Sequence, residues 1–105
     1  MDIRDIKLLC KSGALRWTDH VIMRLIQRGV NREDVKYVLI KGEIIEQYPD
    51  DYPFPSCLLY GKSLNGNPLH VVCGRGTDEL WVITAYRPSL IKWNDDYKTR
   101  RRLRQ

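Results

Sequence analysis

The sequence predicts an α+β fold in which N-terminal helices pack on one face of a small, curved, four-stranded antiparallel sheet. Apolar residues recur at helical spacing as far as Gly42, and beyond it the period changes to two, with β-branched and aromatic residues between frequent turn signals. Helices that precede a run of strands are typical of α+β folds. The chain has 105 residues, of which 43% are hydrophobic and 30% charged, so residues 1–105 are expected to form one domain with a modest core.

Three helices are expected before Gly42. A first helix is predicted over residues 2–11. A second helix, with Thr18 or Asp19 as its N-cap and Gly29 as its stop, is predicted to run to about Arg28. The third begins at the N-cap Asn31 and ends at Gly42. Each predicted end therefore rests on a residue type that favours a helix terminus.

Four strands are expected after Gly42, in the segments EIIEQY, SCLLYGK, LHVVCGR and LWVITAY. Asn65-Gly66 is a strong hairpin signal between the second and third strands, and residues 76–79 form a turn between the third and fourth. The stretch YPDDYPFP holds too many prolines for a strand and predicts a rigid connection. Past Pro88 the chain is mostly polar, and we expect a basic C-terminal tail from about residue 98. Its RRRLR run is typical of a solvated, frayed terminus, with a role in gripping RNA or docking a partner as the alternative.

The charge balance points toward an anionic partner. Eighteen Lys and Arg against thirteen Asp and Glu give a net charge of +5 and a pI near 9.3. Arg suits phosphate because its planar guanidinium can donate two hydrogen bonds at once. Many basic proteins bind no nucleic acid, so composition alone leaves the partner open.

Cysteine usage and the first residues indicate a compartment. The three cysteines lie far apart and include no C-x-x-C pair, which is typical of small core residues in a reducing cytoplasm. The opening MDIRDIKLLC carries two acids and no long apolar run, so it predicts neither a signal peptide nor a membrane span. We expect a cytoplasmic protein without a membrane partner.

A stripe of cations runs through RWTDHVIMRLIQRG, where Arg16, His20, Arg24 and Arg28 recur at every fourth position. On the second helix, His20, Arg24 and Arg28 share one arc, with apolar residues on the opposite arc. Such an arc is often only the solvated face of a helix. This one holds no acid for i,i+4 pairs, so its like charges repel one another and favour an external anion.

His70 in PLHVV, and Tyr86 and Arg87 at the end of the last strand, are further candidates. Each alone is more often a structural residue than a functional one. If the last two strands pair with His70 opposite Tyr86, the two side chains share a face, with Cβ atoms about 5 Å apart. A shift of one residue would put Tyr86 on the other face, and the sequence leaves both registers open.

Five motifs, WTDH, GEIIEQYPDD, PSCLLYG, PLHVV and ITAYRP, follow one another between about Trp17 and Trp93. In this order and spacing the chain closely resembles a bacterial and archaeal domain-of-unknown-function family related to the RelE, BrnT and MqsR ribonuclease toxins. The resemblance implies a RelE-like (BECR-type) toxin of a toxin–antitoxin pair, an endoribonuclease that cuts RNA, mRNA in particular, without a metal or other cofactor. It also implies a cognate antitoxin as protein partner, in some cases one with a C-x-x-C zinc finger.

The proposed chemistry is attack of a 2′-OH on the neighbouring phosphate. It needs a base for the hydroxyl, an acid for the leaving 5′-oxygen, and cations for the charge that gathers on the phosphoryl oxygens. A His with a pKa near 6.5 suits proton transfer, and nearby Arg favours its neutral form. RelE-like enzymes often work with Lys, Arg and Tyr instead of His, so their roles cannot simply be copied. The predicted site residues are, for catalysis, His20, Arg24, His70 and Tyr86, and, for binding RNA phosphates, Arg16, Arg28 and Arg87.

Other catalytic chemistries have weaker support. A metal nuclease would need clustered carboxylates, for which the candidates are Glu43, Glu46, Asp50 and Asp51. The last two lie in a stretch of ordinary turn residues, and we expect no metal site. Ser56 and Cys57 lack the elbow or neighbouring base of a nucleophile.

A catalytically silent module that binds RNA or a protein through the same basic face is the alternative to the nuclease. Both need the cations, but only the nuclease needs a titrating pair. Convergence of His20 and His70 with Arg24 in one cleft would therefore favour the nuclease.

Overall fold

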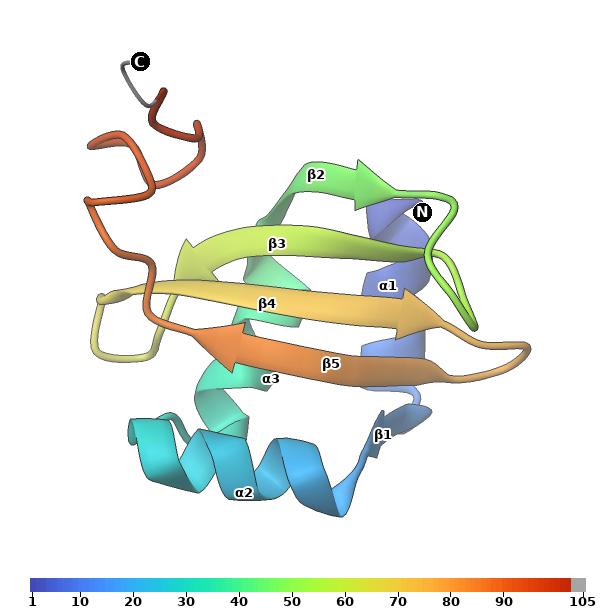
Figure 1. Cartoon of the computed structure of the whole chain (residues 1–105). Coiled ribbons are helices and arrows are strands. Elements are labelled where there is room, and N and C mark those ends of the chain that lie inside the picture. The colour runs from blue at the N-terminus through green and yellow to red at the C-terminus, as the bar shows by residue number, and fades with distance from the viewer. Residues whose placement is uncertain (103–105) are drawn as a thin grey trace.

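Figure 1 shows the computed structural model of the chain, which describes residues 1–102. In this part of the chain, three helices pack against one face of a five-stranded sheet. None of these helices is long and apolar enough to cross a membrane. The elements follow in the order α1 (Ile3–Lys11), β1 (Leu15–Trp17), α2 (Asp19–Arg28), α3 (Arg32–Lys41), β2 (Glu43–Tyr48), β3 (Ser56–Lys62), β4 (Pro68–Arg75) and β5 (Leu80–Tyr86).

The strand order is β1-β5-β4-β3-β2, and β1 runs parallel to β5 while the other neighbours are antiparallel. The prediction of a four-stranded antiparallel sheet of the RelE-like type is therefore wrong, both in the number of strands and in the direction of one pair. β1 consists of LRW alone, which is too short for an alternating pattern to be recognised. It is a strand because Leu15 lies beside Leu80, a partner far away in the sequence.

The predicted helix ends are confirmed. The Asn31 side chain accepts a hydrogen bond from the backbone N–H of Asp34, as an N-cap does, and Thr18 does the same for Val21 at the start of α2. At the end of α2, Gly29 adopts the left-handed conformation, with φ of 66°, that lets the chain leave the helix. These ends were predictable because each depends on residues within one turn.

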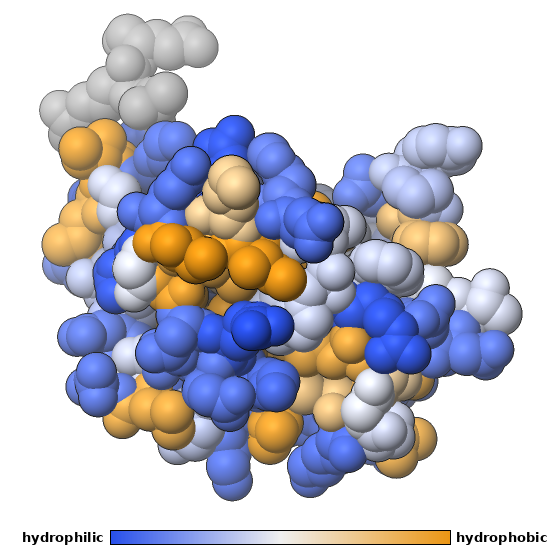
Figure 2. Space-filling model, turned by 90° about the horizontal axis from the view of Figure 1, so that it is seen from below, coloured by the Kyte–Doolittle hydropathy of each residue, from blue (hydrophilic) through white to orange (hydrophobic). Residues whose placement is uncertain are grey.

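Helix α2 buries less of its apolar arc than its sequence suggests. Val21 and Leu25 are buried against the sheet, but Ile26 on the same arc is 74% exposed. Met23, which lies beside His20 and Arg24, is 61% exposed. Seen from below, where α2 lies, hydrophobic and hydrophilic side chains form adjoining patches on the surface (Figure 2).

The core lies between the helices and one face of the sheet. Alternate residues of β4, namely Leu69, Val71 and Cys73, point into it, so His70 and Val72 belong to the opposite face. The fully buried core side chains come from α1, α3 and the central strands, and include Ile6, Val35, Val38, Leu39, Cys57, Leu59, Val71, Cys73, Leu80 and Ala85.

The pairing of β4 with β5 places His70 directly opposite Tyr86, so this predicted register is confirmed. A β-bulge follows between Val72 and Cys73, which shifts the register in the remainder of the pair. His70 and Tyr86 consequently share the face of the sheet that the helices do not cover.

Residues 87–102 fold back across the end of the sheet (Figure 1). Trp93 is only 2% exposed and forms an isolated bridge with Arg100. Arg100 in turn binds Glu46 on β2. The segment from residue 98, predicted as a solvated tail, is thus held against the sheet as far as Arg100, while residues 103–105 of the RRRLR run and the C-terminus lie outside the described residues.

Candidate functional site

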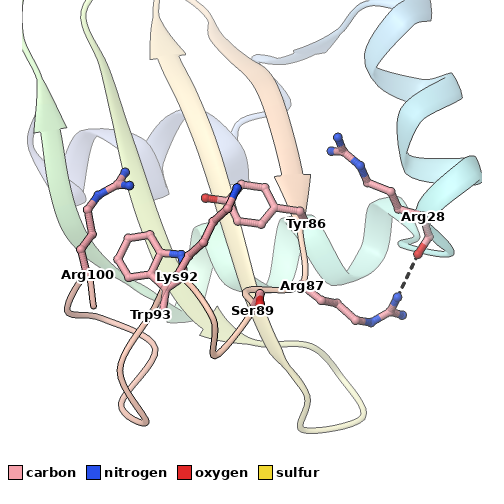
Figure 3. A pocket seen from close by; sticks show the side chains of 7 residues that line it. All are labelled: Arg28, Tyr86, Arg87, Ser89, Lys92, Trp93 and Arg100. Atoms are coloured by element: carbon pink, nitrogen blue, oxygen red, sulfur yellow. Dashed lines mark hydrogen bonds between the residues drawn. The ribbon is translucent and has the colours of Figure 1, made fainter. Parts of the chain in front are cut away.

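An open cavity of about 430 Å³ lies where β5 ends and the C-terminal segment begins (Figure 3). Four of its seven lining residues are cations, and none is an acid. Such a cavity attracts anions, and guanidinium groups in particular suit phosphate. The lining residues are Arg28, Tyr86, Arg87, Ser89, Lys92, Trp93 and Arg100.

Arg28 and Arg87 tie the end of α2 to the end of β5. β1 pairs with only the first half of β5, so the carbonyl of Ala85 lies on a free strand edge. There it accepts a hydrogen bond of 3.0 Å from Nη1 of Arg28. The same Nη1 atom also donates to Thr84 Oγ1 at 2.9 Å. The Arg87 guanidinium donates to the backbone carbonyls of Arg28 and Gly29, at 2.8 and 3.0 Å, which are otherwise unpaired carbonyls at a helix end. Both side chains are therefore held in place before any ligand binds.

Arg100 forms the opposite wall of the cavity. Its Nε and Nη2 atoms donate to the two carboxylate oxygens of Glu46 at 2.8 and 2.9 Å, and its guanidinium lies 4.8 Å from the centre of the Trp93 ring. The hydrogen bonds from Arg100 are the main reason that the pKa of Glu46 is lowered. Glu46 is thus the ionised partner of Arg100 and is not among the residues that line the cavity.

Lys92 also lines the cavity, and Figure 3 shows its side chain extending from the C-terminal segment on the side where Tyr86 lies. Among residues 1–102, no side-chain hydrogen bond or ion pair holds its ammonium group. Lys92 is therefore the cavity cation with the greatest freedom to meet a ligand.

His70 lies directly behind Tyr86. Its side chain is completely buried, its Nε2 atom is 2.7 Å from the carbonyl of Tyr97, and its Nδ1 atom is 3.4 Å from the Tyr86 hydroxyl. A carbonyl can only accept, so Nε2 carries the proton and the lone pair of Nδ1 faces Tyr86. Trp93 packs edge-on against the imidazole at 4.6 Å.

Burial is the main cause of the two pKa shifts at this pair. It lowers the pKa of His70, against the opposing effects of the Tyr97 carbonyl and Glu46. It raises the pKa of Tyr86, and the positive charges of Arg100 and Arg28 counteract part of that rise. In the absence of ligand, His70 is therefore neutral and Tyr86 is protonated at neutral pH.

A family model described as "Domain of unknown function (DUF4258)" matches residues 17–87, two thirds of the chain. The chain belongs to the DUF4258 family. No curated protein matches it. The matched range includes Arg28, His70, Tyr86 and Arg87, and it ends before Lys92 and the other lining residues of the C-terminal segment.

The cationic stripe does not form one surface. Arg16 belongs to β1 and pairs with Glu79 at 2.6 Å, beside the beginning of β5. His20 and Arg24 line a separate hollow together with Met23 and Gln27. Arg28 follows His20 by eight residues, about 12 Å along the helix axis, and lies at the end of β5.

Of the seven predicted site residues of this DUF4258 chain, the structure brings four together. Arg28, Tyr86 and Arg87 line one cavity, with His70 behind Tyr86. The convergence of His20 and His70 with Arg24 in one cleft is not seen.

Four lining residues were missed by the sequence prediction because they follow the DUF4258 match in a polar stretch without periodicity. The available signal was Trp93, because a single Trp in a polar segment is expected to pack against another part of the chain. Here Trp93 is buried and packs edge-on against His70 of β4. The missed residues are Ser89, Lys92, Trp93 and Arg100.

Among residues 1–102 of the DUF4258 chain, no three His, Cys, Asp or Glu side chains form a group suited to a metal ion. The carboxylates of the predicted candidates serve separate contacts. Glu46 binds Arg100, and Asp51 accepts a hydrogen bond from Ser56 at 2.6 Å.

Proposed function

We propose that this DUF4258 protein is a metal-independent endoribonuclease, and that the cationic cavity at the end of β5 binds the scissile phosphate. The observation that carries the proposal is the arrangement of four cations around Tyr86, whose hydroxyl is backed by a buried, neutral His70. Cations in a preformed cavity stabilise the charge that develops on phosphoryl oxygens.

The reaction is a transfer within the RNA chain. The 2′-oxygen forms a bond to phosphorus, the bond from phosphorus to the 5′-oxygen breaks, and the products are a 2′,3′-cyclic phosphate and a 5′-hydroxyl. Tyr86 accepts the proton of the 2′-OH as its own proton passes to Nδ1 of His70, for which the tautomer of His70 leaves the lone pair ready. Lys92, with its mobile ammonium group, donates a proton to the leaving 5′-oxygen, while Arg28 and Arg87 hold the phosphate.

The biological setting is proposed from the resemblance to ribonuclease toxins. The cavity supplies Lys, Arg and Tyr, the residue types that RelE-like enzymes often use, instead of the predicted pair of histidines. We propose a cytoplasmic toxin that acts on mRNA and is neutralised by an antitoxin, in some cases one with a C-x-x-C zinc finger. Expression alone should then slow growth, the Tyr86→Phe variant should not, and the product of an adjacent gene should restore growth.

The direct test is incubation of the purified protein with single-stranded RNA in EDTA. We expect cleavage to persist and to leave 2′,3′-cyclic phosphate ends. Tyr86→Phe should lower the rate by about 10² to 10⁴, the range for loss of a proton-transfer group. The matched control is His20→Ala, which removes a histidine from the other hollow and should leave the rate unchanged. Chelator-sensitive cleavage, or full activity of Tyr86→Phe, would contradict the mechanism.

A catalytically silent binding module is the second candidate, favoured by the burial of His70 and by its separation from the hollow that holds His20 and Arg24. Such a module needs the cations of the cavity but no titrating pair. It would bind RNA in a manner that depends on Lys92, and leave that RNA uncut at every pH tested.

A further inference from the structure

A second hollow, of about 440 Å³, adjoins the cationic cavity. It is lined by Ile91, Lys92, Arg100 and Arg101, so it shares Lys92 and Arg100 with the first cavity. These two side chains form a wall between two cationic depressions. An anion in either depression would meet them.

Arg101 is held in place by the turn that carries Lys92. Its Nε atom donates to the carbonyls of Leu90 at 2.8 Å and Trp93 at 3.2 Å, and its backbone N–H donates to the carbonyl of Lys92 at 2.8 Å. One Nη2 contact of 3.5 Å reaches Asp95, whose side chain is 96% exposed. The anchoring of Nε leaves the outer part of the guanidinium at the surface of the hollow, where its partial exposure permits contact with a ligand.

The second hollow differs from a simple solvated surface in its composition. Three of its four lining residues are cations, no acid lines it, and the fourth, Ile91, is 80% exposed. An apolar side chain beside cations suits a ligand that combines negative charge with an apolar face, as a nucleotide does. All four residues follow the part of the chain that matches the family, so the C-terminal segment alone supplies the lining of this hollow.

We infer that the second hollow binds the phosphate next to the scissile one, so that the protein selects RNA chains with at least two consecutive phosphodiesters. The inference rests on the proposed function, since it takes the first cavity as the site of the scissile phosphate. Two phosphates of one strand are like charges at a separation set by the nucleotide between them. Two cationic depressions with a shared wall of Lys92 and Arg100 match that pattern, whereas one isolated phosphate occupies only one of them.

The test compares uncleavable 2′-O-methyl oligouridylates of two and three nucleotides without terminal phosphates, which carry one and two phosphodiesters. Binding is measured by titration of tryptophan fluorescence or by calorimetry. We expect the second phosphate to raise the affinity by about fivefold, the upper end for one exposed ion pair. The slope of log affinity against log salt should steepen from about −0.7 to about −1.4, as single-stranded phosphates release counterions.

Three variants assign the gain to Arg101. Arg101→Gln should bind both oligonucleotides with nearly equal affinity, and Arg101→Lys, which keeps the charge but loses the Nε donor, should keep the gain. Arg4→Ala removes one exposed cation from α1 and should also keep it. Loss of the gain in Arg101→Lys as well would overturn the role of the charge, and an undiminished gain in Arg101→Gln would overturn the assignment to this hollow.

The remaining outcomes separate this inference from the proposed function. If the dinucleotide binds and the trinucleotide binds no more tightly, the second subsite is refuted while the first cavity keeps its role. If neither oligonucleotide binds, both proposals fail. If an oligoglutamate with two carboxylates binds as tightly as the trinucleotide, and its affinity falls equally in Arg101→Gln, the hollow serves an acidic protein. The inference about RNA is then overturned.

Discussion

Replacement of Lys92 by Ala tests whether the cationic cavity, and not the stripe on α2, binds RNA. Lys92 contributes to the wall between the two depressions and makes no side-chain hydrogen bond or ion pair within residues 1–102. Its removal should therefore delete a phosphate contact without breaking an internal one. The matched change is Arg24→Ala, which removes one cation from the separate hollow on α2.

The expected magnitude follows from the number of phosphates that the two depressions neutralise. With one phosphate in each depression, log affinity for single-stranded RNA should fall with log salt at a slope of about −1.4, and loss of one phosphate contact in Lys92→Ala should reduce the slope to about −0.7. Between about 50 and 200 mM salt, the wild-type affinity should then drop about 7-fold and that of Lys92→Ala about 2.6-fold. Arg24→Ala should retain the wild-type slope.

The assay is titration of an uncleavable 2′-O-methyl oligonucleotide at several salt concentrations for the three proteins. Equal melting temperatures of the variants would show that the fold is kept. A flattened slope in Arg24→Ala together with an unchanged slope in Lys92→Ala would refute the cavity as the RNA site. It would return that role to the stripe on α2.

Three further predictions concern the structure on which the site depends. Trp93→Ala should weaken the docking of the C-terminal segment by about 3–5 kcal/mol, because Trp93 is only 2% exposed. Faster cleavage by trypsin within residues 88–102 would reveal the weaker docking. Resistance to trypsin equal to that of the wild type would show that Trp93 does not hold the segment. Because burial lowers the pKa of His70 in the folded state, the protein should lose stability as the pH falls below about 6.5, the value of an unperturbed His, and thermal melts of a His70→Gln variant should lack that component. Gly42→Ala should destabilise the fold by roughly 1–3 kcal/mol or more, because the added Cβ would lie 2.5 Å from the carbonyl oxygen of Val38 and 2.6 Å from that of Tyr60; an unchanged urea midpoint would contradict this packing.

Much of the local structure could be predicted because short-range interactions produce it. The caps at Thr18 and Asn31, and the stop at Gly29, each depend on residues within about one helical turn. In β4 and β5, the alternation of side chains between the two faces of the sheet follows from the sequence of each strand alone. The register that places His70 opposite Tyr86 was one of two that the sequence left open. Burial on one side of the sheet then selects one register, since a slip by one residue would expose the apolar face.

The candidate site was only partly predictable, because most of its geometry comes from residues distant in sequence. The sequence indicated Arg28, Tyr86 and Arg87 as candidates, but it could not show that the free edge of β5 would draw Arg28 to Ala85. It also joined Arg28 to His20 and Arg24 by their common spacing, although the length of the helix separates them. Spacing along a helix determines which residues share a face, but not which neighbour each part of that face meets.

The sequence by itself determined the helices, the four longer strands, the basic character of the chain and the individual cations, because these depend on residue type and near neighbours. Only the tertiary structure decided that LRW forms a fifth strand beside β5, and that residues after Pro88 complete the cavity. Both features rest on contacts across long stretches of chain, such as Leu15 with Leu80 and Glu46 with Arg100. A strand of three residues and a polar segment carry too little local pattern to reveal their partners, and the free energy that orders them comes from burial and pairing in the folded chain.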